Sequence, residues 1–470
     1  MSRFLIPVII LVFAAAAYPA GGVTAFVGVN VVPMDGERVL ANQTVIVQNG
    51  IIRQMGDARK VKTPKGAQII DGKGKYLIPG LTDMHVHLMS DDDFPRELAA
   101  DELRIMVANG VTTIRIMNGM PEHLEMRARA AKGEAVSPTL YVASPQFIGK
   151  KTDHSYVVTT PDEGRESVRK AKAGGYDYLK MVTDLKPEVY EAIVDEAKKQ
   201  GMRVVGHADS RSIGLDRALK AGQQIEHLDA YMEALVKPDS PVKGSVSDIY
   251  IYNVKNWDSL DYIDESKIAE VARETVKSNP FSDPTLSMFK WSFGIPRSEE
   301  SIRAQPDFRF YPKAKQTFWL GINKRIWDRP ISLERRARYV DLRNRIVKAI
   351  YDAGGKIMAG SDTPEFLFLY GFSLHREIKA IRDAGLSNFA ALQSATSNPA
   401  EFFGTLDKTG TIAKGKRADL VLLTANPLDD ISNTEKREGV MLRGKWYTQE
   451  EMNKWLDEIA PRFGAVEIKE

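Results

Sequence analysis

The sequence contains no cysteine among its 470 residues. This absence excludes disulfides, a lipid-modified cysteine and any thiolate site. Without disulfides the chain must be held together by its hydrophobic core, and an apolar content of 43% is enough for a sizeable one.

Net charge is also small. Lys and Arg together exceed Asp and Glu by 3, and the two signs are interspersed along the chain. A nucleic-acid-binding protein usually concentrates basic residues on one face, so we expect no nucleic-acid partner. The sequence leaves open whether the chain forms a homo-oligomer.

Long apolar runs are scarce, and the main one is N-terminal. Residues 1–22 contain one arginine, an apolar run from Phe4 to Ala17 and then small residues, which is the layout of a signal peptide. This run is too short to span a bilayer comfortably. We therefore expect an exported protein, periplasmic or secreted, with no stable membrane insertion after signal cleavage.

Two β-rich regions lie on either side of a middle region that has a different secondary-structure pattern. Residues 23–79 and 404–450 consist of short β-prone segments broken by Gly, Asn and Asp, which predicts a small composite β-sandwich domain built from both chain ends. Residues 80–403 alternate β-prone and amphipathic segments in about eight units, typical of an α/β (β/α)8 TIM-like barrel. Residues 451–470 are predicted to form a C-terminal helix or tail. The long stretch 232–345 is either a substrate-covering insertion or an added packing layer.

Polar side chains recur where the predicted barrel strands end. His85 and His87 are two residues apart, so their side chains point to the same face of an extended strand. The C-terminal ends of barrel strands meet at one mouth, so we expect the following residues to converge there: His85, His87, Lys180, His207, His227 and Asp362. His123 and His375 lie in helical patterns and are interpreted as structural.

These residue types suit a metal centre. Imidazole and carboxylate bind Zn²⁺ and related ions, and two such ions bridged by an oxygen give a nucleophile near neutral pH. Lys180 does not fit as an ammonium, but a neutral lysine can react with carbon dioxide to form a carbamate that bridges metals. Spacing alone leaves open whether Lys180 does this or is an ordinary ion-paired barrel lysine.

Several longer segments carry a family resemblance. IIDGKGKYLIPGLTDMHVHL, LKMV, VVGHA, IEHLD, AGSDTP and GTIAKGKRADLVLL closely resemble the amidohydrolase superfamily, specifically its imidazolonepropionase-like branch that includes Xaa-Pro dipeptidases. The resemblance implies that His85, His87 and Asp362 bind one metal, His207 and His227 the second, and a carboxylated Lys180 both. It also implies that Asp362 moves a proton from the bridging hydroxide to the leaving amine.

The resemblance also implies a small-molecule or dipeptide substrate. Dipeptidases resembling this chain hold substrate with a tyrosine and a histidine, roles that would fall to Tyr231 and His154. Arg115 offers a charge for a carboxylate, or a structural ion pair. Zn²⁺ suits the ligand set, and Mn²⁺, Co²⁺ or Fe²⁺ also fit.

The leading hypothesis is a binuclear hydrolase that cleaves an amide or peptide bond, in Xaa-Pro dipeptides or N-acyl amino acids. One alternative is a mononuclear cyclic-amide hydrolase or deaminase, against which Lys180 argues. Another is a lactone or organophosphate ester hydrolase, because the same hydroxide attacks polarised esters. A metal-free binding or scaffold protein conflicts with the presence of all six candidate ligands.

Overall fold

The computed structural model describes residues 22–88, 95, 98–150, 152, 155–242, 246 and 251–466. The predicted signal peptide falls almost wholly on residues 1–21, and the substrate-binding candidate His154 also lies outside the described residues. No helix within the described ranges is both long and apolar enough to cross a membrane.

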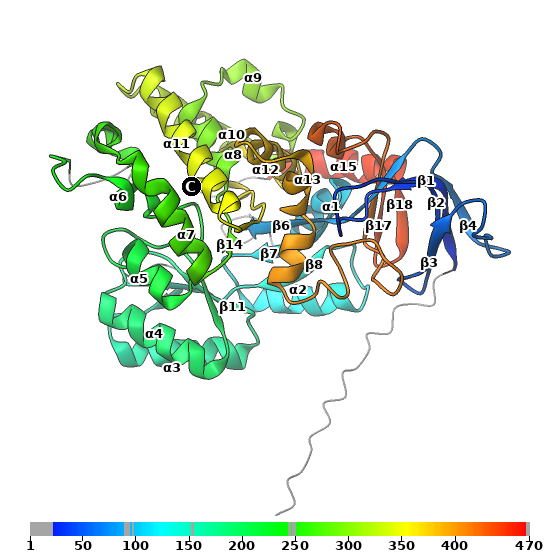
Figure 1. The fold of residues 1–470 in the computed structure, drawn as a ribbon, viewed down its shortest axis with the longest axis horizontal. Helices are drawn as coiled ribbons and strands as arrows, with labels where there is room; N and C mark the ends of the chain where they lie inside the picture. The colour runs from blue at the N-terminus through cyan, green and yellow to red at the C-terminus, as the bar shows by residue number, and fades with distance from the viewer. Residues whose placement is uncertain are drawn as a thin grey trace, which may run out of the picture.

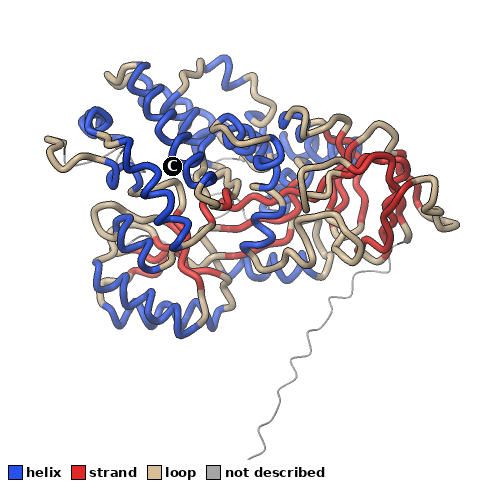
Figure 2. The backbone as a smooth tube through the Cα atoms, viewed as in Figure 1, coloured by secondary structure: helices blue, strands red, loops and turns tan. Residues whose placement is uncertain are grey.

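The two β-rich chain ends form one eight-stranded sheet. Strand order is β18-β17-β16-β5-β1-β2-β3, with β4 paired to β1. The strands are β1 (Thr24–Val31), β2 (Leu40–Gln48), β3 (Ile51–Asp57), β4 (Gln68–Asp71), β5 (Tyr76–Pro79), β16 (Leu420–Leu423), β17 (Arg437–Leu442) and β18 (Lys445–Thr448). Antiparallel pairing of β16 with β5 joins the two chain ends, and the sheet lies at one end of the molecule (Figure 2). The predicted composite β module is thus confirmed, with its strands hydrogen-bonded into a single sheet.

The β module has its own apolar core, separate from that of the barrel. Phe26, Val45 and Leu77 from the N-terminal strands pack with Leu422 and Met441 from the C-terminal ones, and all five are buried. Alternating burial along these strands is what places one set of side chains inside. Both chain ends are therefore needed to complete this core.

The middle of the chain forms the parallel barrel strands. They are β6 (Leu81–Val86), β7 (Val111–Ile116), β8 (Thr139–Val142), β11 (Tyr178–Met181), β12 (Arg203–Gly206), β13 (Gln224–Ile225), β14 (Phe281–Ser282) and β15 (Lys356–Ile357), with β9 (Gln146–Ile148) and β10 (Ser155–Val157) extending the ladder beside β11. Parallel bridges Ala143↔Tyr178, Glu226↔Asp283 and Val86↔Thr363 join the separate ladders. The strands therefore run around a ring, and the predicted TIM-like architecture is confirmed.

Helices surround this ring (Figure 1). Those that follow the early strands are α1 (Ala99–Ala108), α2 (Pro121–Ala131), α3 (Pro161–Gly174), α4 (Pro187–Gln200), α5 (Gly214–Ala221) and α6 (Tyr231–Leu235). The later ones are α7 (Ile268–Ser278), α8 (Leu286–Phe289), α9 (Glu299–Arg303), α10 (Lys313–Trp327), α11 (Leu333–Asp352), α12 (Phe372–Asp383), α13 (Asn388–Gln393) and α14 (Ser397–Phe402). Helix α15 (Gln449–Gly464) lies where a C-terminal helix was expected and contacts α1.

The long stretch 232–345 contains a barrel strand as well as added helices. Besides β14 and α7 to α11 it includes a 3₁₀ segment η4 (Val254–Tyr262) and a π-helical turn η6 (Lys290–Gly294) directly after α8. Single π-helical turns occur frequently at functional sites. Within this stretch α11 packs on α7, and Met288, Phe289 and Phe293 reach the cavity described below.

Candidate active site

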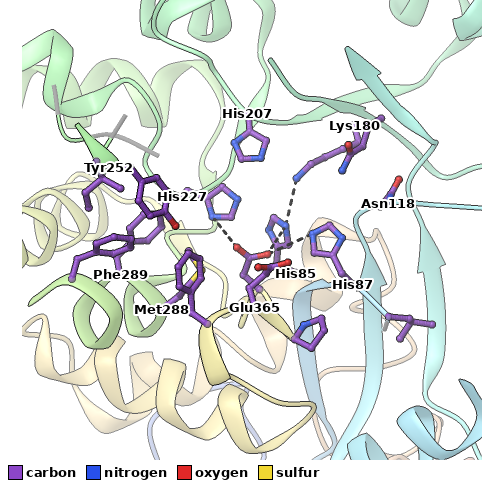
Figure 3. A pocket seen from close by; sticks show the side chains of 17 residues that line it. His85, His87, Asn118, Lys180, His207, His227, Tyr252, Met288, Phe289 and Glu365 are labelled. Atoms are coloured by element: carbon purple, nitrogen blue, oxygen red, sulfur yellow. Dashed lines mark hydrogen bonds and ion pairs between the residues drawn. The ribbon is translucent and has the colours of Figure 1, made fainter. Parts of the chain in front are cut away.

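Six polar side chains meet at one cavity. They are the residues that the sequence places at strand ends: His85, His87, Lys180, His207, His227 and Asp362. The cavity has a volume of about 340 Å³, within the range usual for small-molecule sites. Figure 3 shows the labelled imidazoles and Lys180 directed toward a common centre.

Backbone geometry explains how they converge. His85 lies in β6 and Lys180 in β11, while His207 directly follows β12 and His227 follows β13. Asp362 follows β15 and donates its backbone N–H to the carbonyl of His85, 2.9 Å away. His227 and Asp362 have φ angles of +59° and +53°, a conformation uncommon outside glycine that is often held at functional sites.

Asp362 lies at the centre of the imidazoles. Its Oδ1 is 3.4 Å from His85 Nε2 and 3.5 Å from His87 Nε2, and its Oδ2 is 3.9 Å from His227 Nδ1. The rings themselves are close, with centroids 4.7 Å apart for His85 and His227 and 4.8 Å apart for His207 and His227. Several donor atoms therefore point at one small volume.

Neighbouring residues hold the imidazoles in place. His85 Nδ1 donates to Glu226 at 2.9 Å, and His207 Nδ1 donates to Asp229 at 2.7 Å. His227 Nδ1 lies 2.8 Å from the hydroxyl of Thr285. A second partner on one ring nitrogen orients the other nitrogen toward a metal, as in many metal sites.

Burial acts against the charged forms of several of these groups. Burial lowers the pKa of His85 and His227 well below the ordinary value, and burial lowers the pKa of His87 to about 3. Burial also lowers the pKa of Lys180, whose Nζ lies 3.4 Å from His85 Nε2. Neutral imidazole and neutral amine are the forms that can donate a lone pair.

The donor set fits divalent metal ions. Ligand atoms of His85, His227 and Asp362 lie within 4.8 Å of one another and all three residues are buried. Nitrogen donors from neutral imidazole and oxygen donors from carboxylate suit Zn²⁺ and other first-row divalent ions. His87, His207 and Lys180 line the same cavity and extend this set beyond what a single ion needs.

Arg115 does not line the cavity. It is fully buried beneath it and donates to the Met84 carbonyl at 2.6 Å and to Glu226 and Asp283 at 2.7 and 3.2 Å. Because Glu226 in turn accepts from His85, Arg115 supports a candidate ligand through an ion-pair chain. Of the two readings of Arg115, the structural ion pair is the one observed.

Tyr231 is also placed away from the cavity. Tyr231 is 1% exposed, and its hydroxyl lies 3.0 Å from Oγ1 of Thr275, a buried residue of α7. The arrangement therefore gives no support to substrate binding by Tyr231. His123 and His375 fit the structural interpretation: His123 accepts from the N–H of Met120 at the start of α2, and His375 is enclosed between α12 and its neighbours.

The cavity has a second side that the polar pattern did not predict. Tyr252, Phe289, Phe293 and Phe366, here called the aromatic wall, line it together with Met288. In Figure 3 the labelled Tyr252 and Phe289 lie across the cavity from Lys180 and Asn118. The many aromatic residues of 232–345 were the available signal for this wall, but the sequence does not indicate which of these rings face the cavity.

Other residues near the site also escaped the sequence reasoning. Glu226 directly precedes His227 in IEHLD, and Asp283 follows β14. Together with His85 they form a second buried group of potential ligand atoms within 4.8 Å of one another. Arg115 donates to both carboxylates of this group, which makes it a support beneath the site.

Comparisons with known proteins agree with this geometry. Residues 76–447 match the model of the amidohydrolase family. Enamidase from Eubacterium barkeri is 31% identical over 183 residues, which cover 37% of this chain and only 46% of that relative. Less than half the length of that relative is thus matched.

Solved structures extend the similarity to nearly the whole fold. Bottromycin amidohydrolase superposes with a TM-score of 0.74 at 23% identity, covering 95% of this chain and 92% of that one. A Xaa-Pro dipeptidase with methionine bound in its active site superposes with a TM-score of 0.63 at 20% identity, covering 91% and 100%. At such identities the likeness is one of fold.

The family match covers most of the chain, including β5, β16 and β17 of the β module and the whole barrel. Amidohydrolases act on carbon–nitrogen bonds and generally use divalent metal ions, and the buried donor set at the barrel mouth is consistent with both properties. The chain belongs to the amidohydrolase family.

Proposed function

We propose that the protein hydrolyses an amide bond of a dipeptide or an N-acyl amino acid at the barrel mouth, with two divalent metal ions held by the six candidate ligands. The observation that carries this proposal is the convergence of four imidazoles, one lysine and one carboxylate on a single buried cavity. The fold likeness to a Xaa-Pro dipeptidase supports dipeptides as substrates to test.

His85, His87 and Asp362 would hold one ion, and His207 and His227 the other. Divalent ions in such a site supply Lewis acidity toward the scissile carbonyl and lower the pKa of a water molecule. Glu226, Asp229 and Thr285 contribute by fixing the orientation of His85, His207 and His227.

Lys180 would join the two ions as a carbamate. Its amine is 1% exposed, and burial lowers its pKa, which favours the unprotonated form that reacts. The nitrogen forms a bond to the carbon of carbon dioxide and one proton is released, so that two carboxylate-like oxygens result. Zn²⁺ is the ion proposed first, and Mn²⁺, Co²⁺ and Fe²⁺ suit the same donors.

Asp362 would move the proton. Its carboxylate accepts a proton from the attacking water and passes it to the nitrogen of the leaving amine as the carbon–nitrogen bond breaks. The position of Asp362 among His85, His87 and His227 supports this role, because the reacting atoms must lie at the same centre. The balance is one water consumed and one acid and one amine produced.

Metal stoichiometry is the experiment that tests this proposal first. The protein is expressed with divalent metal and bicarbonate, freed of loosely bound ions and analysed for metal, and then assayed on Xaa-Pro dipeptides and N-acyl amino acids. About two ions per chain together with amide hydrolysis would support it. One ion or none would exclude the bridged centre.

An amide other than a peptide, such as a cyclic amide, is the second candidate substrate, and the similarity to an enamidase supports it. Such chemistry with one metal would leave Lys180 without a bridging role. A single ion per chain, together with activity on a ring amide and none on dipeptides, would select this alternative.

We also propose that the protein is exported. The arginine, the apolar run from Phe4 to Ala17 and the small residues after it support this. Sequencing the N-terminus of protein recovered from the periplasm or medium tests it, and an intact Met1 there would contradict cleavage.

A further inference from the structure

We propose that the aromatic wall binds an uncharged aromatic, or similarly broad apolar, group of the substrate beside the scissile amide. This inference rests on the proposed amide hydrolysis and specifies which amides are preferred. None of the candidate metal ligands belongs to the aromatic wall, and His227 lies at its border.

The rings form a continuous path that starts at the candidate metal centre. Phe289 lies 6.0 Å from His227 and 6.1 Å from Phe293, measured between ring centroids. Phe293 in turn lies 5.6 Å from Tyr252 and 5.7 Å from Phe366. Such distances are those of favourable aromatic packing, so a planar group entering the cavity meets a surface of ring faces and edges.

The path continues outward from the cavity. Tyr252 and Phe366 are stacked at 6.5 Å, and Trp319 of α10 lies 5.1 Å from Phe366. Tyr252 is 36% exposed and Phe318, next to Trp319, is 51% exposed. An apolar surface that runs from solvent to a buried polar centre marks a ligand-binding region.

The rings are held in position from behind. Arg343 lies over the Phe289 ring at 3.9 Å, and Glu377 of α12 accepts the backbone N–H groups of Leu286 and Ser287 at the start of α8. Arg329 lies over Tyr252 at 5.2 Å and donates to its carbonyl. A preformed apolar surface loses little conformational freedom when a ligand binds.

Phe366 supplies independent support. Its φ angle is +50° and that of the following Leu367 is +65°, a strained backbone for residues other than glycine. Such strain persists where surrounding contacts demand it, often in ligand clamps. Here the strained turn directs a phenyl ring to line the cavity four residues after Asp362.

The lining of this wall disfavours an anionic group. Apart from the six candidate ligands and Glu365, every described residue lining the cavity is uncharged. No arginine lines it among the described residues, and its lysine is Lys180. A carboxylate pressed against the rings would lose its hydration without gaining a cation, which is unfavourable.

The test compares matched amides. Two pairs of amides are used. In each pair one amide carries a methyl substituent and the other a benzyl substituent. The substituent is on the acyl group in the first pair and on the amine in the second. For the metal-loaded protein we expect kcat/KM to favour the benzyl member of at least one pair by roughly tenfold or more. Equal rates for both members of both pairs would overturn the inference.

Variants assign the preference to the wall. Tyr252→Ala removes a half-exposed ring, and Phe366→Gly removes a ring at a backbone position that glycine adopts readily. Each should reduce the benzyl preference severalfold. Tyr351→Ala is the matched control, because Tyr351 is 38% exposed in α11 and does not line the cavity. If Tyr252→Ala and Phe366→Gly, folded as judged by thermal unfolding, keep the full preference, the wall does not select substrate.

The inference and the proposed function fail in different ways. Hydrolysis of all four amides at equal rates refutes the wall alone. If a protein with two bound ions hydrolyses none of them, amide hydrolysis of this kind is refuted, and calorimetric binding of the same amides then tests the wall. Tighter binding of the benzyl members that is lost in Tyr252→Ala would still support it, and equal binding would overturn it.

Discussion

The two sides of the cavity are built in different ways. The polar side holds His85, Lys180 and His207 on or directly after the parallel strands β6, β11 and β12. The residues of the aromatic wall come from short helices and turns. Tyr252 lies just before η4, Phe289 ends α8, Phe293 lies in η6, and Phe366 lies in a turn. Strands fix the groups that need accurate geometry, while short helices and turns present a surface that can vary without disturbing them.

The comparison predicts that substitutions on the polar side lower turnover or metal binding strongly, whereas those on the aromatic wall alter substrate preference and leave metal content intact.

Lys180→Ala should have the largest effect. Loss of the proposed bridge lowers metal content and rate together, by roughly 10⁴-fold in rate if several kcal/mol of charge stabilisation are lost. Metal analysis and kcat/KM measure both, and a short carboxylic acid should restore part of each. Unchanged metal content and rate would remove the carbamate from the mechanism.

Asp362→Asn should reduce kcat by roughly 10³-fold, because the amide cannot accept and return the proton. KM should change far less, since the substituted side chain keeps its shape. Steady-state kinetics over a range of substrate concentrations separates the two constants. A loss confined to KM would place the proton transfer on another residue.

Glu226→Gln should weaken metal binding by roughly 10- to 100-fold, because Glu226 accepts from His85 Nδ1 at 2.9 Å and orients its other nitrogen. Competition with a chelator measures the affinity. Gln224→Ala is a neighbouring control that removes an Arg115 partner without touching His85. Equal losses in both variants would mean that the effect comes from disturbed packing around Arg115.

Phe289→Leu on the aromatic wall should leave metal content unchanged and alter kcat/KM by less than about tenfold, because an apolar side chain of similar volume still covers the cavity. Metal analysis beside kinetics on benzyl and methyl amides checks this. Loss of metal from this variant would show that the aromatic wall also supports the metal site, since the ring of Phe289 lies 6.0 Å from that of His227.

His375 lies on neither side of the cavity, so the substitution His375→Gln should change turnover least. Burial lowers the pKa of His375 to about 3 from its ordinary 6.5, so the folded protein keeps it neutral. Below pH 6.5 the unfolded chain binds a proton that the folded chain does not, and stability therefore falls as pH decreases toward 3. Thermal unfolding between pH 7 and pH 5 should show a smaller decrease for the variant. An identical decrease would show that other groups govern acid sensitivity.

The polar side could be predicted because it follows from local pattern. Each candidate ligand stands where an apolar strand gives way to a loop, and the geometry of a parallel barrel brings such ends together. Even the short strands β13 and β15, two residues each, kept His227 and Asp362 at the mouth. The family resemblance suggested Tyr231 as a substrate-binding residue, and its charge suggested Arg115, but the fold directs Tyr231 to Thr275 and places Arg115 beneath the site.

The sequence by itself determined the barrel, the composite β module and the six candidate ligands, because strand period, strand-end position and residue chemistry are local properties. Only the tertiary structure decided the aromatic wall. Tyr252, Phe293 and Phe366 come from segments far apart in the chain, and which rings face the cavity depends on how α8, η6 and the turn after Asp362 pack on one another. That packing is a property of the whole fold, which no local pattern contains.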